Sequence, residues 1–341
     1  MIANTACSCV KIHPSRGAIL VLEKIEHLVA PEIYGLEEEM ARILGSDHPF
    51  LQELNRRTMA SPGKRLRPKL LILCSKMLGY QGPLPLLFAA VFELVHTATL
   101  IHDDIIDDAD MRRGRMTLNR ELGTAITVLY GDFVYTKSYS AAVEIGNLDA
   151  LKTITWVSQS MIEGEILQNK YNFDLEIDEG VYFDILTRKT AHLFAGITKT
   201  AGLLAGLNEA DLQALFEFGM CFGKSFQLID DYLDYLGSAA QMGKPVLSDL
   251  REGKVTLPVI RLLARRGSAI GETIRHWWRH VDRPIPPSLL EALQGDSGLR
   301  ETKQMADRYA HQAVGFLDRF PVNEFSETLK KIPLHLLERS H

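Results

Sequence analysis

Cysteine is scarce in this chain of 341 residues, with four in all: Cys7, Cys9, Cys74 and Cys221. Cys7 and Cys9 have no second cysteine pair or histidine cluster to complete a zinc site, and Cys74 and Cys221 stand among apolar residues. So few cysteines exclude a disulfide-stabilised secreted scaffold. We therefore predict a reduced, cytoplasmic protein.

Long apolar runs and a large charge of one sign are also missing. The longest apolar run, Leu86–Val95, contains Glu93 and is shorter than the roughly 20 residues that span a bilayer. Lys and Arg number 38 against 43 Asp and Glu, a net charge of −5, which excludes binding to nucleic acid through bulk basic charge. Neither glycine-rich nucleotide-binding motif occurs. We expect no transmembrane segment, no nucleic-acid partner and no nucleotide-binding fold.

Helical periodicity dominates the rest of the chain, with Pro and Gly at the joints and no convincing alternation of β-branched residues. The predicted helical segments are Ile19–Leu44, Pro85–Asp108, Thr124–Gly146, Leu151–Asn169, Glu179–Leu204, Glu209–Leu236 and Thr256–Ala264. We predict one large all-α domain over residues 19–341, with a peripheral break at 284–287. Residues 1–18 are interpreted as a tail, because the first 22 residues resemble a transit peptide only weakly.

Two aspartate clusters of the same spacing carry most of the information. Asp103-Asp104-Ile-Ile-Asp107 and Asp230-Asp231-Tyr-Leu-Asp234 lie 127 residues apart, and each follows an apolar helical segment. On a helix, the first and last aspartates of a cluster are about 40° apart, so they share a face and repel each other. Carboxylates without Cys or paired His suit a hard cation such as Mg²⁺, Mn²⁺ or Ca²⁺. Two such clusters indicate a polyphosphate held by several Mg²⁺ ions.

Basic residues stand where an anion would need them. Lys64 and Arg67 precede or open a helix predicted to begin near Pro68, and helix N-termini favour anions. Arg112 and Arg113 follow the first cluster. The other candidates share a face or a flank with a cluster: His96, Lys189, Thr190, Gln227, Lys244 and Lys254. Any one of the lysines is more often a solvated surface residue, but their repeated placement beside the acid clusters favours a binding role.

Together these residues resemble the trans-isoprenyl diphosphate synthases, or polyprenyl synthetase family, from about Pro31 to at least Leu263. The motifs that carry the resemblance are Gly63-Lys-Arg-Leu-Arg-Pro68, His96-Thr-Ala-Thr-Leu-Ile-His-Asp-Asp104, Asp107 through Arg112-Arg113-Gly114, Gly131-Asp-Phe133, Gly164-Glu-Ile-Leu-Gln168, Lys189-Thr-Ala191, Phe226-Gln-Leu-Ile-Asp-Asp-Tyr-Leu-Asp234, Gly243-Lys-Pro245 and Asp249-Leu-Arg-Glu-Gly-Lys254. The resemblance implies an isoprenoid synthase fold, a single helical bundle around a central cavity, and usually a homodimer. Leu247, where the family commonly has Gly, and Lys224 depart from the pattern.

The resemblance also implies a role for each candidate residue. Mg²⁺ ligands would be Asp103, Asp107 and Asp230, with Asp104, Asp231 and Asp234 acting through water. Isopentenyl diphosphate would bind Lys64, Arg67, His96 and Arg113, and the allylic diphosphate would bind Arg112, with Lys254 as a further diphosphate contact. Lys189, Thr190 and Gln227 would surround the ionising allylic carbon. The reaction would condense farnesyl or geranylgeranyl diphosphate with isopentenyl diphosphate.

Product length is predicted from Ala98 and Thr99, one turn before the first cluster. Short-chain members with this cluster spacing often carry an aromatic residue there, so small residues favour a long C30 to C50 product of the octaprenyl, heptaprenyl or solanesyl type, for a quinone side chain. The tunnel floor would lie lower, near Leu129, Tyr130 or Phe133. Alternatives are a short-chain geranylgeranyl synthase, a class I terpene cyclase, a regulatory subunit of a heteromeric synthase, and a non-catalytic acidic bundle that buffers metal.

Overall fold

The structure, a computed structural model, describes residues 16–60, 63–236, 246–280 and 283–338. Most of the predicted tail, including Cys7 and Cys9, and the Gly243-Lys244-Pro245 motif lie outside these ranges. The first helix begins at Arg16, inside the stretch predicted as tail. The predicted domain boundary at residue 19 therefore falls within a helix.

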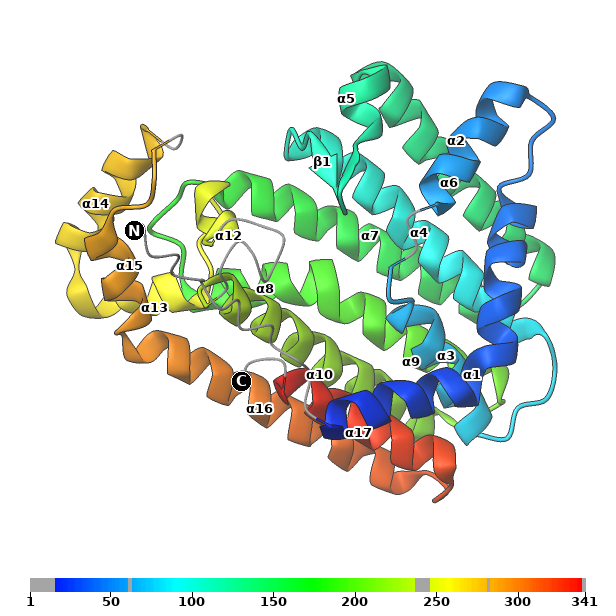
Figure 1. The fold of residues 1–341 in the computed structure, drawn as a ribbon. Coiled ribbons are helices and arrows are strands. Elements are labelled where there is room, and N and C mark those ends of the chain that lie inside the picture. The colour runs from blue at the N-terminus through cyan, green and yellow to red at the C-terminus, as the bar shows by residue number, and fades with distance from the viewer. Residues whose placement is uncertain (1–15, 61–62, 237–245, 281–282, 339–341) are drawn as a thin grey trace, which may run out of the picture.

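Helices make up nearly all of the described chain (Figure 1). The first half contains α1 (Arg16–Ile43), α2 (Pro49–Met59), α3 (Leu66–Met77), α4 (Leu84–Ile106), a hairpin of β1 (Met111–Arg112) and β2 (Arg115–Met116), α5 (Leu118–Leu122), α6 (Thr124–Ile145) and α7 (Leu148–Tyr171). The second half contains α8 (Glu179–Leu186), the π-helix η1 (Thr187–Ala191), α9 (His192–Leu204), α10 (Glu209–Asp234), α12 (Ser248–Arg251), α13 (Leu257–Arg266), α14 (Ser268–Trp278), α15 (Pro287–Gln294), α16 (Ser297–Phe316), the 3₁₀-helix η2 (Leu317–Arg319) and α17 (Glu324–Glu338).

Local sequence signals set several helix starts. The Asn147 side chain accepts from the backbone N–H of Ala150, so α7 begins three residues before the periodic segment predicted to start at Leu151. Asn208 caps α10 in the same way, through the N–H of Asp211. The predicted helix Glu179–Leu204 is one continuous rod, but it contains the π turn η1 in its middle. A period of 3.6 residues does not reveal such a turn, and it matters for the site.

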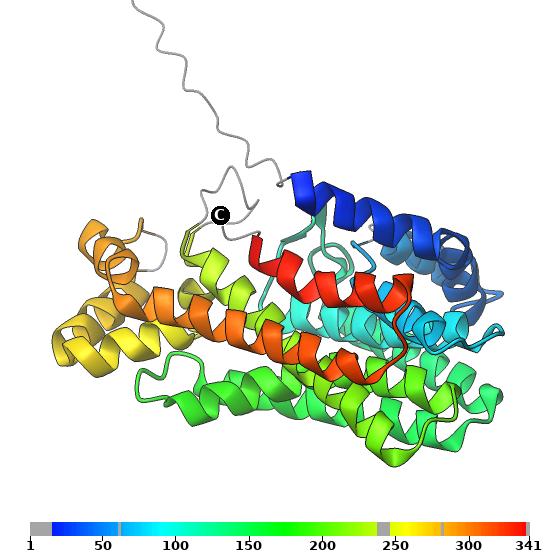
Figure 2. The same cartoon turned by 90° about the horizontal axis from the view of Figure 1, so that it is seen from below.

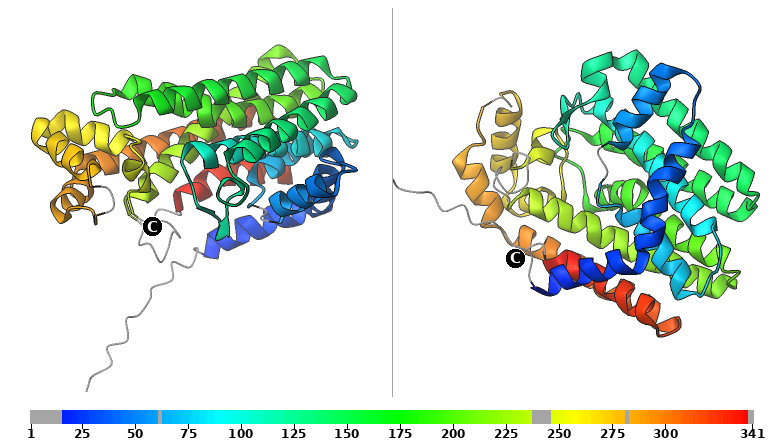
Figure 3. Two further views of the ribbon diagram at one scale, coloured as in Figure 1. Left: turned by 90° about the horizontal axis from the view of Figure 1, so that it is seen from above. Right: turned by 45° about the vertical axis from the view of Figure 1, so that its right-hand side comes forward.

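The long helices surround α4 and α10. Figure 2 shows α1 and α17, the two ends of the described chain, side by side on one face, with α16 next to them. Figure 3 shows from two further directions that most long helices run roughly along one axis. One core cluster centres on α3, α4, α9 and α10, and a second lies where the end of α10 meets α13, α15 and α16. These packed faces fix the ends of α4 and α10, which carry the aspartates.

Helix α4 is so apolar that it has the length and hydropathy to cross a membrane, and no other helix of the described ranges does. In its most apolar window 61% of the helix is buried inside the bundle. A core helix of a globular protein passes the same test, because it too is apolar on most sides. Only the end of α4 carries clustered charge.

Candidate active site

The first aspartate cluster lies at the C-terminal end of α4, where protein cations hold two of its carboxylates. Asp104 is buried and accepts a hydrogen bond from Nε of Arg112 at 2.5 Å. Asp107, the C-cap of the helix, accepts from Nζ of Lys254 at 3.0 Å. Carboxylates at a helix C-terminus face the negative end of the macrodipole, so a nearby cation stabilises them. These two hydrogen bonds connect the end of α4 to the hairpin and to Lys254, which lies just before α13.

The hairpin after α4 presents the two predicted arginines. Arg113 and Gly114 form its two-residue turn with φ of 51° and 75°. Two successive positive φ angles are typical of a type I′ turn, and glycine at the second position adopts this conformation without a steric penalty. The turn projects Arg112 and Arg113 from a tight ribbon directly beside the aspartates.

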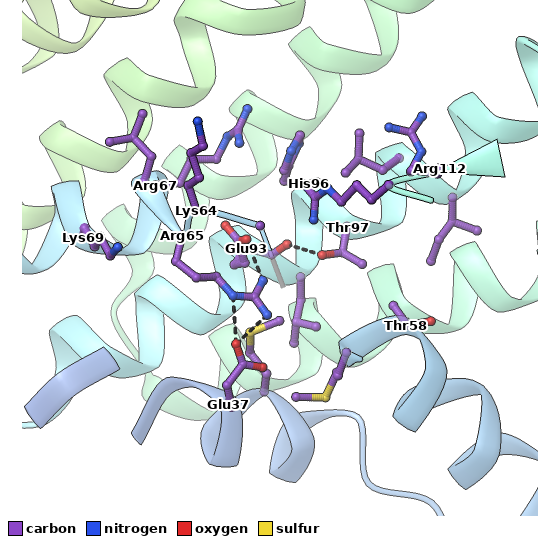
Figure 4. Close-up of a pocket in the computed structure, with 18 of the residues that line it drawn as sticks. Glu37, Thr58, Lys64, Arg65, Arg67, Lys69, Glu93, His96, Thr97 and Arg112 are labelled. Carbon is purple, nitrogen blue, oxygen red and sulfur yellow. Dashed lines mark hydrogen bonds and ion pairs between the residues drawn. The ribbon is translucent and has the colours of Figure 1, made fainter. Parts of the chain in front are cut away.

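A cavity of about 1270 Å³ opens between α1, α2, α3, α4 and the hairpin. Figure 4 shows Lys64, Arg67, His96 and Arg112 converging on it from separate elements. The predicted site residues in its wall are Lys64, Arg67, His96, Asp104, Arg112 and Arg113. The structure therefore gathers the whole predicted isopentenyl diphosphate set at one place, next to an acid of the first cluster.

The electrostatics of this wall suit an anion. Arg67 Nε and His96 Nδ1 are buried and find no hydrogen-bond partner among the residues that the structure describes. Burial lowers the pKa of His96 well below its usual value, and the charges of Arg67, Arg113 and Arg112 lower it further. Burial also lowers the pKa of the Arg67 guanidinium, which lies 5.3 Å from the centre of the Phe194 ring. Unsatisfied buried donors and crowded cations are costly until an acceptor with negative charge enters.

Arg65 has a different role, which the sequence reading left unassigned. Its guanidinium bridges two helices, bonding Glu93 of α4 at 2.7 Å and Glu37 of α1 at 2.6 Å (Figure 4). Arg65 has a left-handed φ of 50° at the N-cap of α3. The bridge fixes the segment that carries Lys64 and Arg67. The sequence carried a sign of this ion pair, because Glu93 stands inside its longest apolar run. A carboxylate buried there needs a cationic partner.

The second aspartate cluster ends α10, and its three members differ sharply. Asp230 is exposed, whereas Asp231 is buried and accepts hydrogen bonds from Tyr182 and Gln227. Asp234 accepts from the backbone N–H and hydroxyl of Ser248 at 3.1 and 2.7 Å, so it caps the start of α12. Asp231 and Asp234 therefore have protein partners, and their predicted action on metal through water stays a prediction.

The backbone conformation at residue 247 accounts for one of the two departures from the family pattern, the leucine at a position where the family commonly has glycine. Leu247 has a φ of 59°, in the left-handed region where glycine is favoured, and its side chain is fully buried. A non-glycine residue there carries strain on the order of 1–3 kcal/mol, which burial of the leucine side chain offsets. The loop keeps a glycine-like conformation with a leucine. Lys224, the other departure, lies over the Tyr309 ring at 5.4 Å from its centre.

The predicted residues Lys189 and Thr190 lie on the π turn η1. A Cβ added at Gly164 of α7 would lie 2.8 Å from the backbone nitrogen of Lys189, so only glycine lets the two helices approach this closely. Lys189 forms an ion pair with Glu165, and the Thr190 hydroxyl donates to Gln227 at 2.9 Å. π turns are rare and often occur at functional sites.

The acids near Asp103 could hold a divalent cation. Burial raises the pKa of Asp103 to about 7, with smaller contributions from the charges of Glu165 and Asp107, while Lys189 opposes the shift. Across the described ranges no three acidic or histidine side chains converge as a finished metal site. Partly buried carboxylates without Cys or His partners have the donor type that Mg²⁺ and Mn²⁺ prefer. The raised pKa of Asp103 reflects an unfavourable negative charge that a bound cation would stabilise.

The residues predicted to set product length are less easily placed. Ala98 is fully buried on α4, and neither Ala98 nor Thr99 lines the cavity described above. Leu129 is 66% exposed, so it does not form an interior floor, and the Tyr130 hydroxyl donates to Asn55 of α2. Burial raises the pKa of Tyr135 on α6, and the nearby carboxylate of Asp103 raises the pKa of this tyrosine slightly further. The sequence reading missed this tyrosine.

With this geometry in view, comparisons with known proteins identify the family. The family model described as polyprenyl synthetase matches residues 48–282. The chain is 36% identical to octaprenyl diphosphate synthase of Escherichia coli, over 90% of this chain and 96% of that protein. It is 31% identical to the chloroplastic solanesyl-diphosphate synthase 2 of rice, over 96% of this chain and 83% of that protein.

Solved structures agree. A decaprenyl diphosphate synthase from Rhodobacter capsulatus superposes with a TM-score of 0.88 at 30% identity, covering 94% of this chain and 99% of that one. A polyprenyl synthase from Caulobacter crescentus, complexed with calcium and isoprenyl diphosphate, superposes with a TM-score of 0.86 at 32% identity. The match covers 94% of this chain and 98% of that one. The protein is thus an all-α enzyme of the isoprenoid synthase fold, as the sequence predicted. It belongs to the polyprenyl synthetase family, and its predicted class as a prenyltransferase is confirmed.

Proposed function

We propose that this enzyme condenses an allylic diphosphate, farnesyl or geranylgeranyl diphosphate, with isopentenyl diphosphate to make a long-chain all-trans polyprenyl diphosphate for quinone side chains. One observation carries the proposal: Asp104 of the first aspartate cluster and the cradle of Lys64, Arg67, His96 and Arg113 line the same cavity. An acid cluster and a basic cradle side by side fit two diphosphates, one bound with metal and one without. The octaprenyl and solanesyl synthases among the relatives support the long product.

We propose Asp103, Asp107 and Asp230 as ligands of Mg²⁺, with Mn²⁺ as a substitute, and calcium in the Caulobacter structure supports a divalent ion. Bound there, the ions would neutralise the allylic diphosphate and make it a leaving group. Arg112 and Lys254 would contact the same diphosphate. Lys64, Arg67 and Arg113 would hold isopentenyl diphosphate with its double bond beside the allylic carbon, so much of the rate gain is orientation.

Metal affinity should depend on pH through Asp103. Its pKa is raised to about 7 by burial, and a metal ion binds only the ionised carboxylate. The ionised fraction rises about tenfold between pH 6 and pH 8, so we expect Mg²⁺ to bind about tenfold more tightly at pH 8. Calorimetric titration of the enzyme with Mg²⁺ at the two pH values measures this. Equal affinities would contradict the assignment.

One incubation tests the function. Purified enzyme receives farnesyl diphosphate, isopentenyl diphosphate and Mg²⁺, and the dephosphorylated products are separated by chain length. We expect C30 to C50 products, and shorter ones from Ala98→Tyr, because short-chain members with this cluster spacing often carry an aromatic residue at this position. Thermal unfolding of the variant serves as its control, since Ala98 is buried and an overpacked core costs about 1–3 kcal/mol. If the wild-type enzyme does not elongate the primer, the synthase assignment is rejected, and a cyclic hydrocarbon product would indicate a terpene cyclase. Full-length products from Ala98→Tyr would reject the assignment of residue 98 to product length.

We propose that the enzyme is a cytoplasmic homodimer. Helices α6 and α7, which follow each other in the chain, expose several large apolar side chains: Ile126, Leu129, Val143, Ile162 and Ile166. Light scattering should give twice the mass of the chain, and Leu129→Asp with Ile162→Asp should give a monomer. The matched control is Val322→Asp, because Val322 is an apolar residue outside α6 and α7 and is 80% exposed. A dimer that survives the double substitution would contradict this interface.

A further inference from the structure

Four side chains form a continuous hydrogen-bonded chain beside the second aspartate cluster. The Tyr182 hydroxyl of α8 donates to Oδ2 of Asp231 at 2.5 Å, and Nε2 of Gln227 donates to Oδ1 of the same carboxylate at 2.8 Å. The Thr190 hydroxyl then donates to Oε1 of Gln227 at 2.9 Å. Tyr182 and Asp231 are 6% and 3% exposed. We call these four residues the relay.

The relay has a fixed direction. Both oxygens of Asp231 accept hydrogen bonds, so a flipped Gln227 amide would place its oxygen against a carboxylate oxygen at 2.8 Å. That contact is repulsive, and the amide must therefore keep its oxygen toward Thr190. An amide oxygen can only accept, so the Thr190 hydroxyl has to donate to it. The hydroxyl proton of Thr190 then points at Gln227, and the two lone pairs of the threonine oxygen face away from it.

The backbone supports the same arrangement. Tyr182 and Thr190 are eight residues apart on one rod, which in an uninterrupted α-helix would place them about 80° apart around the axis. The π turn Thr187–Ala191 lies between them and turns less per residue, because its hydrogen bonds reach five residues back instead of four. It brings Thr190 toward the face of Tyr182. Both can then reach α10, where Gln227 and Asp231 are one turn apart.

We propose that Tyr182 is a positioning residue. Through Asp231 and Gln227 it holds the Thr190 hydroxyl with its oxygen, and not its proton, toward the allylic carbon that ionises. An oriented oxygen stabilises developing positive charge, whereas a hydroxyl proton pointing the same way would oppose it. The inference rests on the proposed function, because only that function places an ionising carbon at Thr190. It assigns Asp231 to the relay, in addition to any action on metal.

The test compares Tyr182→Phe with Tyr235→Phe. Both replace a buried tyrosine whose hydroxyl makes a single short bond, since Tyr235 meets the Thr256 hydroxyl at 2.5 Å, but only Tyr182 belongs to the relay. We expect Tyr182→Phe to lower kcat about tenfold, the scale of a lost hydrogen bond to a charged group, with an unchanged KM for isopentenyl diphosphate. Tyr235→Phe should keep kcat within about twofold. Equal losses in the two variants, or a loss that appears in KM alone, would overturn the proposal.

A second measurement separates positioning from a general effect on folding. Thr190→Val removes the hydroxyl that Tyr182 is proposed to orient, so adding Tyr182→Phe to it should cause no further fall in kcat. Independent losses that multiply would contradict the relay. If the wild-type enzyme elongates the primer but the losses in kcat of the two single variants multiply in the double variant, the relay is contradicted and the proposed function stands. If the wild-type enzyme does not elongate, the proposed function fails first and the relay falls with it.

Discussion

Replacing Asp103 with asparagine should lower kcat about a thousandfold, the largest effect expected of any single substitution in this enzyme. The side chain keeps its size, but it loses the charge that would hold a cation between α4 and the leaving diphosphate. The pKa of Asp103 is already raised to about 7 by burial, so the neutral side chain should not unfold the protein. Steady-state kinetics across a range of Mg²⁺ concentrations measure the effect, which added Mg²⁺ should not rescue.

Asp108→Asn is the matched control for this substitution. Asp108 stands one residue beyond the first cluster, is exposed, and has a left-handed φ of 47° that asparagine adopts readily. It removes the same charge from the same end of α4 without touching the cluster. We expect kcat within about twofold of wild type, the scale of a surface charge effect. If both variants lose activity equally, general electrostatics and not metal binding explains the loss.

Replacing Arg67 with glutamine should raise the KM for isopentenyl diphosphate about a hundredfold and change the KM for the allylic substrate little. Its guanidinium is buried against Phe194, so a diphosphate that binds it does so in a setting of low polarity. Two charge-assisted hydrogen bonds of about 1.5 kcal/mol each give this factor. Arg67→Lys should recover only part of it, because lysine lacks the planar fork.

Lys76→Gln provides the comparison for Arg67. Lys76 is a half-buried cation on the same helix α3, but it pairs with Glu32 of α1 and is not among the residues of the cavity wall. Its KM values should stay within about twofold of wild type, because the loss of a partly exposed ion pair falls mainly on stability. A comparable rise in both variants would mean that the net charge of α3, and not the Arg67 contact, controls binding.

Part of this site could be predicted from the sequence. Identical clusters at the ends of two apolar helices predicted hard cations, which stays a prediction, and the structure places Lys64, Arg67, His96 and Arg113 around one cavity, as the family resemblance implied. The product-length residues were harder, because they depend on which side of α6 faces α4. Leu129 lies on the outer side, and an error of about two residues, half a helical turn, reverses the assignment.

Other contacts were out of reach of the sequence for physical reasons. The pair of Arg65 and Glu93 spans 28 residues, and no local pattern reports which cation meets a buried acid. The π turn at Lys189 breaks the helical period for only five residues, too few to alter a hydrophobic pattern. The hydrogen bond from Tyr182 to Asp231 follows only from the tertiary approach of α8 to α10. Periodicity specifies elements and their faces, and long-range partners emerge from packing.

The ion pairs of the first cluster have a thermodynamic consequence. Arg112 pairs with Asp104, and Lys254 pairs with both Asp107 and Glu252. If Asp104 and Asp107 interacted with metal ions, as we propose for the first cluster, Arg112 would be released to phosphate oxygens and Lys254 would keep only its pair with Glu252. Metal and allylic diphosphate should therefore bind with positive cooperativity. By linkage, each raises the affinity of the other by the same factor. The enzyme would then bind the metal ions and the allylic diphosphate together, as one complex.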